Sequence, residues 1–193
     1  MSRRSSLYAS ACALAVALAA QVPQAAAADQ PWMDPHRSAE ERARLADAAM
    51  TDTFDRLAEC PDEDPTLHIE AREITARRRA GGVVWFDFKA LCGGPRSQND
   101  YLEIATQFHT VMLSDVPYLP VNKASEARRF TWLVDVLYDR RVKLIMSAAV
   151  APELIYTEGP LVHEFPRTVS RLNEMQSAEF LALERRTVDT ALT

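Results

Sequence analysis

The sequence predicts an α/β protein in which a small antiparallel sheet precedes a region of alternating helices and strands. From Ser97 onward, stretches with helical and with strand periodicity alternate along the chain. Residues 142–148 are almost continuously apolar, which is typical of a central strand in a parallel sheet. The 193 residues, 48% hydrophobic and 25% charged, suffice for one globular domain and exclude disordered and coiled-coil proteins.

Residues 1–28 form a separate, signal-like segment. Arg3 and Arg4 precede an apolar run at 7–20, and a tract of alanines ends at Ala28. This order is typical of a secretory signal, with cleavage predicted after Ala28 and export to the periplasm as the consequence. The alternative is an alanine-rich tail without a targeting role. In either case we expect the segment to pack on nothing in the rest of the chain.

Residues 29–65 are expected to form a linker and a helix. Ser38 and Glu41 have the spacing of a capping box, so the helix is predicted to begin at Ser38. Apolar residues then recur at helical spacing: Ala46, Ala49, Met50, Phe54 and Leu57. The acidic, proline-containing stretch 60–65 ends the helix.

Residues 66–96 are expected to form a small β subdomain. Two short runs, 66–71 and 73–78, show strand-like alternation, and Gly81-Gly82 is predicted to turn into a further strand at 83–88. The basic run 77–79 is interpreted as a solvated strand end. A contact with phosphate or DNA is the alternative for this run.

Residues 97–193 contain the alternating part of the chain. Ser97 is predicted to cap a helix that buries Tyr101, Ile104, Ala105 and Phe108, and Ser125 to cap one that buries Phe130, Leu133, Val134 and Leu137. Strands are predicted at 110–113 and 142–148, and a final helix at 167–184. The two strands should be parallel neighbours, because the intervening helix allows a right-handed crossover. One edge of the sheet is expected to be bare and apolar.

The charge balance and the cysteines exclude several functions. Lys+Arg numbers 22 against 27 Asp+Glu, a net charge of -5, which argues against a nucleic-acid partner. No stretch beyond the signal-like segment is apolar enough for a transmembrane helix. The three cysteines include no CxxC pair, which argues against zinc or another structural metal and against a disulfide scaffold. Cys60 and Cys92 would remain after cleavage and could pair in an oxidising compartment.

The sequence contains no motif of a self-sufficient active site. It has no G-x-x-x-x-G-K-[ST], no G-x-S-x-G and no H-E-x-x-H. Cys92 has no identifiable partner base, which favours a buried structural cysteine over a nucleophile. The positive charge is nearly all arginine, since only three lysines occur.

Two pairs of arginines are notable. Arg128 and Arg129 lie in the helix before the apolar strand, and Arg167 and Arg171 lie one helical turn apart in the final helix. Guanidinium groups suit bidentate contact with phosphate or carboxylate. The alternative is surface salt bridging, for which the sequence offers Glu126, Asp135, Glu164 and Glu174.

Three segments together resemble a known family. They are Trp85-Phe86-Asp87-Phe88-Lys89-Ala90-Leu91-Cys92 with Asp100-Tyr101-Leu102; the arginine-phenylalanine helix 127–139 with Val142-Lys143-Leu144; and Phe165-Pro166-Arg167 continued through Ser170-Arg171-Leu172-Asn173-Glu174-Met175-Gln176-Ser177. The chain from about Arg42 to Glu184 resembles the C-terminal part of the ZapE cell-division ATPases, bacterial relatives of the mitochondrial Afg-type AAA+ proteins.

The resemblance implies a fold, cofactors and partners. It implies the second half of a P-loop AAA+ core, with a C-terminal helical lid, in an ATPase that uses ATP and magnesium. It also implies a cytoplasmic protein that contacts the FtsZ ring or homologous ATPase subunits at the division site. Arg128 or Arg129 would be the arginine finger that reaches a neighbour's γ-phosphate, and Arg167 or Arg171 would sense the subunit's own nucleotide. A fixed guanidinium stabilises the charge that spreads over the transferring phosphoryl group.

The nucleotide-binding motifs of that family are expected before Arg42, where this sequence has the signal-like segment. We therefore expect the chain by itself to show no ATPase activity, because no lysine reaches the β- and γ-phosphates and no carboxylate holds magnesium. Two alternatives remain: an exported interaction module without enzymatic activity, and a gene fragment without function.

Overall fold

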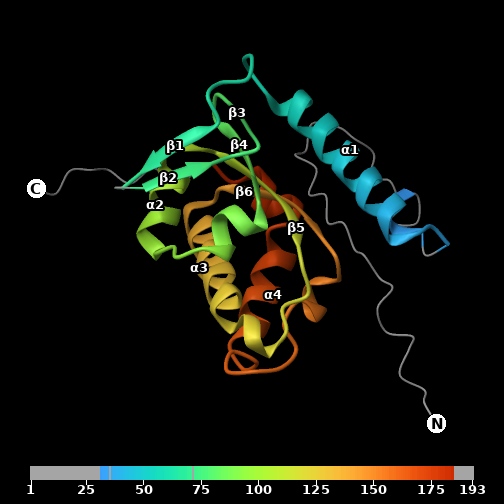
Figure 1. Ribbon diagram of the computed structural model, residues 1–193. Coiled ribbons are helices and arrows are strands. Elements are labelled where there is room, and N and C mark those ends of the chain that lie inside the picture. The colour runs from blue at the N-terminus through green and yellow to red at the C-terminus, as the bar shows by residue number, and fades with distance from the viewer. Residues whose placement is uncertain (1–30, 35, 71, 185–193) are drawn as a thin grey trace, which may run out of the picture.

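The computed structural model describes residues 31–34, 36–70 and 72–184, which form an α/β fold around a four-stranded mixed sheet (Figure 1). The strands are β1 Thr66–Ile69, β2 Arg72–Thr75, β3 Arg78–Ala80, β4 Val83–Asp87, β5 Thr110–Val116 and β6 Lys143–Ala148. The helices are α1 Ala39–Leu57, α2 Gln98–Gln107, α3 Ala124–Arg140, α4 Phe165–Glu174 and α5 Ala178–Ala182. Short helical turns are η2 Pro31–Met33, η3 Lys89–Gly93, η4 Val121–Lys123 and η5 Pro152–Leu154. The signal-like segment 1–28 and its expected lack of packing lie outside the described residues.

The strand order is β3-β4-β5-β6. β4, β5 and β6 are parallel, and β3 is antiparallel to β4. The prediction that the strands around 110–113 and 142–148 are parallel neighbours is therefore confirmed. The predicted small sheet exists only in part: β1 and β2 form an antiparallel hairpin, but β4 pairs in parallel with β5 as well as with β3. A strand whose residues 83–86 are all buried needs neighbours on both sides, and this places it inside the larger sheet.

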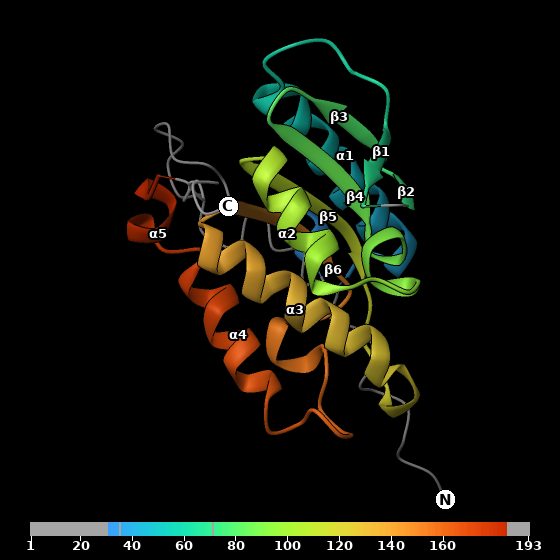
Figure 2. The same cartoon turned by 90° about the vertical axis from the view of Figure 1, so that its left-hand side faces the viewer.

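The two faces of the sheet belong to two separate cores. Alternate residues of β4, β5 and β6 face the helices α2 and α3; they include Val84, Phe86, Val111, Leu113, Leu144 and Met146. The residues between them face α1; they include Val83, Trp85, Met112 and Ile145, which pack with Met50 and Phe54. Figure 2 shows α2 and α3 on one side of the strands and α1 on the other.

Helix α1 begins as the sequence predicts. The Ser38 hydroxyl accepts a hydrogen bond from the Glu41 N–H at 3.1 Å, and the Glu41 carboxylate accepts one from the Ser38 N–H at 3.0 Å. This is the capping box in both directions. Serine Ser97 caps α2 in the same manner.

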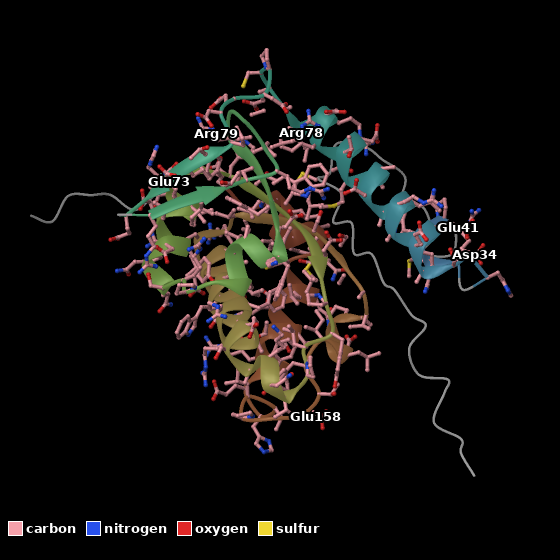
Figure 3. All side chains as sticks on the ribbon, in the orientation of Figure 1. Asp34, Glu41, Glu73, Arg78, Arg79 and Glu158 are labelled. Carbon is pink, nitrogen blue, oxygen red and sulfur yellow. The ribbon has the colours of Figure 1, made fainter. Side chains whose placement is uncertain are left out.

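The arginines of the basic run 77–79 form ion pairs with helix α1 and with the acidic stretch after it, so the interpretation of the run as a solvated strand end is wrong. The partners are Asp47 for Arg77, Asp55 and Asp62 for Arg78, and Glu63 for Arg79, each at 2.7 Å. The Arg78 guanidinium also lies 4.3 Å from the centre of the Phe54 ring. Arg78 holds the pKa of the Asp62 carboxyl below its ordinary value. Figure 3 shows Arg78 beside α1, so the run attaches this helix to the sheet.

Helix α3 buries the apolar stripe that its sequence predicts, since Phe130, Leu133, Val134 and Leu137 are all fully buried. Its start differs from the prediction. The turn η4 leads directly into α3, so Lys123 takes the N-cap position and Ser125 lies inside the first turn without capping it.

The C-terminal region also differs from prediction in two respects. The expected helix 167–184 is divided, because the Ser177 hydroxyl accepts a hydrogen bond from the Phe180 N–H and starts α5 as a new helix. Strand β6 is the edge of the sheet, but it is not bare: its residues are at most 9% exposed. The Lys143 ammonium donates to the Phe180 and Leu183 carbonyls at 2.8 and 2.7 Å, which attaches α5 to this edge.

No described helix is long and apolar enough to cross a bilayer.

A buried hydrogen bond joins the two central strands. The Trp85 indole N–H donates to the Ser114 hydroxyl at 2.7 Å. We predict that Ser114→Ala lowers the free energy of unfolding by about 1–3 kcal/mol, because the indole donor is left buried without an acceptor. Urea denaturation measures the change. The exposed Ser170→Ala is the control and should stay within about 0.5 kcal/mol of the wild type. Equal stability of the two variants would contradict this role of Ser114.

Candidate functional site

The four candidate arginines lie on two helices that pack against each other. Arg128 and Arg129 belong to α3, and Arg167 and Arg171 belong to α4. Both views show α3 and α4 side by side (Figures 1 and 2). The structure separates the four by how firmly each guanidinium is held.

Arg129 is fixed inside the protein. Its Nε donates to the Cys92 carbonyl at 2.7 Å, and its Nη2 lies 3.9 Å from a Glu126 carboxylate oxygen. The side chain is only 16% exposed. Arg129 therefore joins α3 to the turn η3.

Arg171 is held still more firmly. It forms ion pairs with Asp135 and, at 3.3 Å, with Asp139, and its guanidinium lies 4.8 Å from the centre of the Tyr138 ring. The side chain is 12% exposed. All three partners belong to α3, so Arg171 fastens α4 to α3.

Arg128 and Arg167 are accessible. The Arg128 side chain is 40% exposed and forms one ion pair, at 2.7 Å, with Glu164, which is 57% exposed. Arg167 is exposed, and no carboxylate of the described residues lies within ion-pair distance of it. Glu164 immediately precedes α4, so these two arginines lie on adjacent helices near one exposed carboxylate. Exposed ion pairs contribute about 0–1 kcal/mol, so Arg128 can exchange Glu164 for another anion at little cost.

The start of helix α2, which follows a strand and a glycine loop, does not fit a bound triphosphate. The place to test is the junction from β4 through Gly93-Gly94 to α2, a strand, glycine loop and helix in sequence. There the Asp100 carboxylate accepts a hydrogen bond from the Ser97 N–H at 2.6 Å, and the Asp100 N–H donates to the Ser97 hydroxyl. Asp100 is 1% exposed and puts negative charge where a phosphate would lie. The described part of the chain also has no cluster of three acidic, histidine or cysteine side chains that could hold a metal ion.

Several charged side chains that the sequence did not predict as a group lie together at the carboxyl edge of the sheet. Asp87 ends β4, and Asp115 lies near the end of β5 with a φ of 62°, where its N–H donates to the Ser147 hydroxyl. Arg77 reaches Asp87 at 3.4 Å. Protein atoms around the Asp115 carboxyl displace water and raise its pKa, and the nearby Asp87 charge adds to this. The available signal was that both acids lie at the carboxyl ends of apolar strands.

Cys92 is a buried structural cysteine, as predicted. Its side chain is fully buried, and burial raises the pKa of its thiol to about 12. Cys60 and Cys92 are both free thiols, so the pairing considered from the sequence does not form.

Comparison with known proteins identifies the family. Residues 28–184 match the family model described as AFG1-like ATPase. The chain belongs to the AFG1-like ATPase family. The cell division protein ZapE of Escherichia coli K12 is 45% identical to this AFG1-like chain over 123 residues, 64% of this chain and 33% of the relative. The protein of the same name from E. coli O157:H7 has the same values.

A more distant relative is the lactation elevated protein 1 homolog B of zebrafish, Danio rerio. It is 32% identical over 146 residues, 59% of this chain and 29% of the relative. The AFG1-like chain thus spans about a third of the length of the curated relatives it matches. No solved structure matches it.

Because Arg171 is mostly buried in its ion pairs and Arg128 is largely exposed, replacing each by alanine should change the stability of the protein by a different amount. Arg171→Ala should lower the free energy of unfolding by about 1–3 kcal/mol, because a mostly buried, charge-assisted contact between two helices is lost. Arg128→Ala is the matched control and should lower it by less than about 1 kcal/mol. Urea denaturation compares the two. An Arg171→Ala variant as stable as Arg128→Ala would show that Arg171 does not fasten α4.

The thiol of Cys92 should be unreactive in the folded protein. Because its pKa is about 12, almost none of it is thiolate at pH 8, and the side chain is inaccessible as well. We predict that iodoacetamide leaves Cys92 unmodified at pH 8 until guanidinium unfolds the chain. Peptide mass mapping identifies the labelled cysteine. Complete labelling of Cys92 under native conditions is the contrary outcome.

Proposed function

We propose that this AFG1-like chain acts on a nucleotide held by a homologous ATPase subunit, to which it presents Arg128. It does not hydrolyse ATP by itself. The supporting observation is the accessibility of Arg128: of the two arginines in the finger position, Arg129 is bonded to the Cys92 carbonyl, whereas Arg128 has only one exposed partner.

In this proposal the chain's own residues supply charge and position. Glu164 holds the Arg128 guanidinium at the surface before assembly, and the guanidinium moves to the phosphate oxygens of the neighbouring subunit. Its planar fork makes two parallel hydrogen bonds and stabilises charge on the transferring group. Arg167, three residues after Glu164 on α4, adds a second exposed positive charge. ATP and magnesium belong to the neighbouring subunit, which supplies the phosphate-binding loop.

The architecture and the partners follow the same proposal. Strands β4 to β6 with α2 and α3 correspond to the second half of an AAA+ core, and α4 and α5 correspond to its helical lid. The mixed α/β sheet and the family membership support this correspondence. A role in cell division, with the FtsZ ring or homologous subunits as partners, is proposed from the E. coli relative's name and the family resemblance.

The test measures phosphate release by full-length E. coli ZapE with and without this chain. The chain alone should release no phosphate above background, and its addition should raise the turnover of the relative. Arg128→Ala should abolish the increase, because arginine fingers supplied in trans are worth about a thousandfold or more in turnover. Arg128→Lys should restore little, since an ammonium lacks the planar fork.

The control is Arg44→Ala, which removes an exposed arginine from α1 and should leave the increase unchanged. Circular dichroism verifies that each variant is folded. ATP hydrolysis by the isolated chain would refute the proposal, and so would an Arg128→Ala variant that stimulates the relative as well as the wild type does.

A further inference from the structure

Positive side chains gather around the 92–95 loop, which comprises the last two residues of η3 and the first two residues of the connection to α2. The Arg72 and Arg96 Nη1 atoms both approach the Pro95 carbonyl, at 3.4 and 3.2 Å. Two guanidinium groups thus converge on one oxygen at the C-terminal end of the loop. The buried Asp100 carboxylate lies 3.0 Å from Arg72 Nη1 and neutralises one of these two charges, whereas Arg96 has no ion pair with a described residue.

Two further cations lie at the other end of the loop. Arg129 Nε donates to the Cys92 carbonyl at 2.7 Å. Lys89 lies against Gly93, where an added Cβ would be 2.9 Å from the Lys89 Cγ. Arg72, Lys89, Arg96 and Arg129 therefore surround four consecutive residues, in a chain whose net charge is -5.

The carboxylates near this loop do not balance the four cations. Asp100 pairs with Arg72 at 3.0 Å and is buried. Glu126 lies 2.7 Å from Lys123, a fifth cation, and only 3.9 Å from Arg129. Lys89 and Arg96 have no ion pair with a described residue, and the buried Arg96 Nε lacks a hydrogen-bond partner among these residues. The region thus has a surplus of positive charge that an anionic partner would neutralise.

The loop also leaves room for a partner to approach. Gly94 has an extended backbone, and a Cβ added there would meet no atom within 4 Å. The carbonyls of Cys92 and Pro95 orient the guanidinium groups around this open stretch. Orientation before binding lowers the entropy that a partner's contacts must offset.

We propose that the 92–95 loop, with Arg72, Lys89 and Arg96 at its surface, is a docking surface for an acidic segment of a partner protein. The cations lie at both ends of the loop: Lys89 beside Gly93, and Arg72 and Arg96 at the Pro95 carbonyl. An extended peptide places alternate side chains about 7 Å apart on one side, so successive carboxylates can reach both ends. The Ser97 and Asp100 N–H groups at the start of α2 are already engaged, and the buried Asp100 carboxylate puts a negative charge there that disfavours a phosphate. This inference is independent of the role proposed for Arg128.

The experiment titrates the protein into a fluorescein-labelled Glu-Ser-Glu-Ser-Glu-Ser-Glu peptide and follows anisotropy. The wild type should bind saturably, with an affinity that falls as sodium chloride is added. The double variant Lys89→Gln/Arg96→Gln should bind about tenfold more weakly, since it removes two exposed or partly exposed charges. Lys89→Gln alone changes an exposed side chain that forms no ion pair with a described residue, so it should fold as the wild type does and bind about threefold more weakly.

The matched control is Arg37→Gln/Arg44→Gln, which removes the same charge near the start of α1, and α1 packs on the opposite face of the sheet. Its affinity should stay within about twofold of the wild type. Three results would overturn the proposal: no saturable binding by the wild type, equal losses in the two double variants, or tighter binding of sodium tripolyphosphate or a single-stranded oligonucleotide than of the peptide.

Discussion

The burial of helix α3 is the constraint on which the rest of the structure depends. Its apolar stripe lies against the sheet with no exposed surface at Phe130, Leu133, Val134 and Leu137. Arg129 fixes the N-terminal half of α3 to η3, and Arg171 fixes the C-terminal half to α4. Successive residues of a helix point about 100° apart, so the rotation that buries Arg129 leaves Arg128 at the surface. Packing of the core therefore decides which of two adjacent arginines is available to another molecule.

The opposite face of the sheet depends more on charge. Helix α1 covers a smaller apolar core, and the arginines 77–79 connect it and the acidic stretch after it to β3. These ion pairs are partly exposed, so each contributes little alone, but Arg78 combines two carboxylates with the Phe54 ring. The arginine content that first suggested phosphate binding is thus divided between structural contacts and two accessible pairs: Arg128 with Arg167, and Arg72 with Arg96 beside the 92–95 loop.

Local patterns predicted much of this fold, and the errors lie where distant residues decide. The capping serines Ser38 and Ser97 and the stripe of α3 were predicted because a few neighbouring residues determine them. The ion pairs of the run 77–79 were not predicted, because Asp47 lies 30 residues before Arg77. The break at Ser177 was missed because helical periodicity outweighed a capping serine. Among the candidate arginines, the sequence could not separate Arg128 from Arg129, since their difference comes from the Cys92 carbonyl, 37 residues away in the chain.

The central claim is that this chain presents an arginine to a nucleotide bound elsewhere and does not hold the nucleotide itself. Isothermal titration of ATP with magnesium into the purified chain tests it most directly. We expect no saturable heat up to millimolar ATP, because the buried Asp100 carboxylate occupies the helix terminus after the glycine loop. Saturable binding of one ATP per chain with a micromolar Kd would contradict the claim.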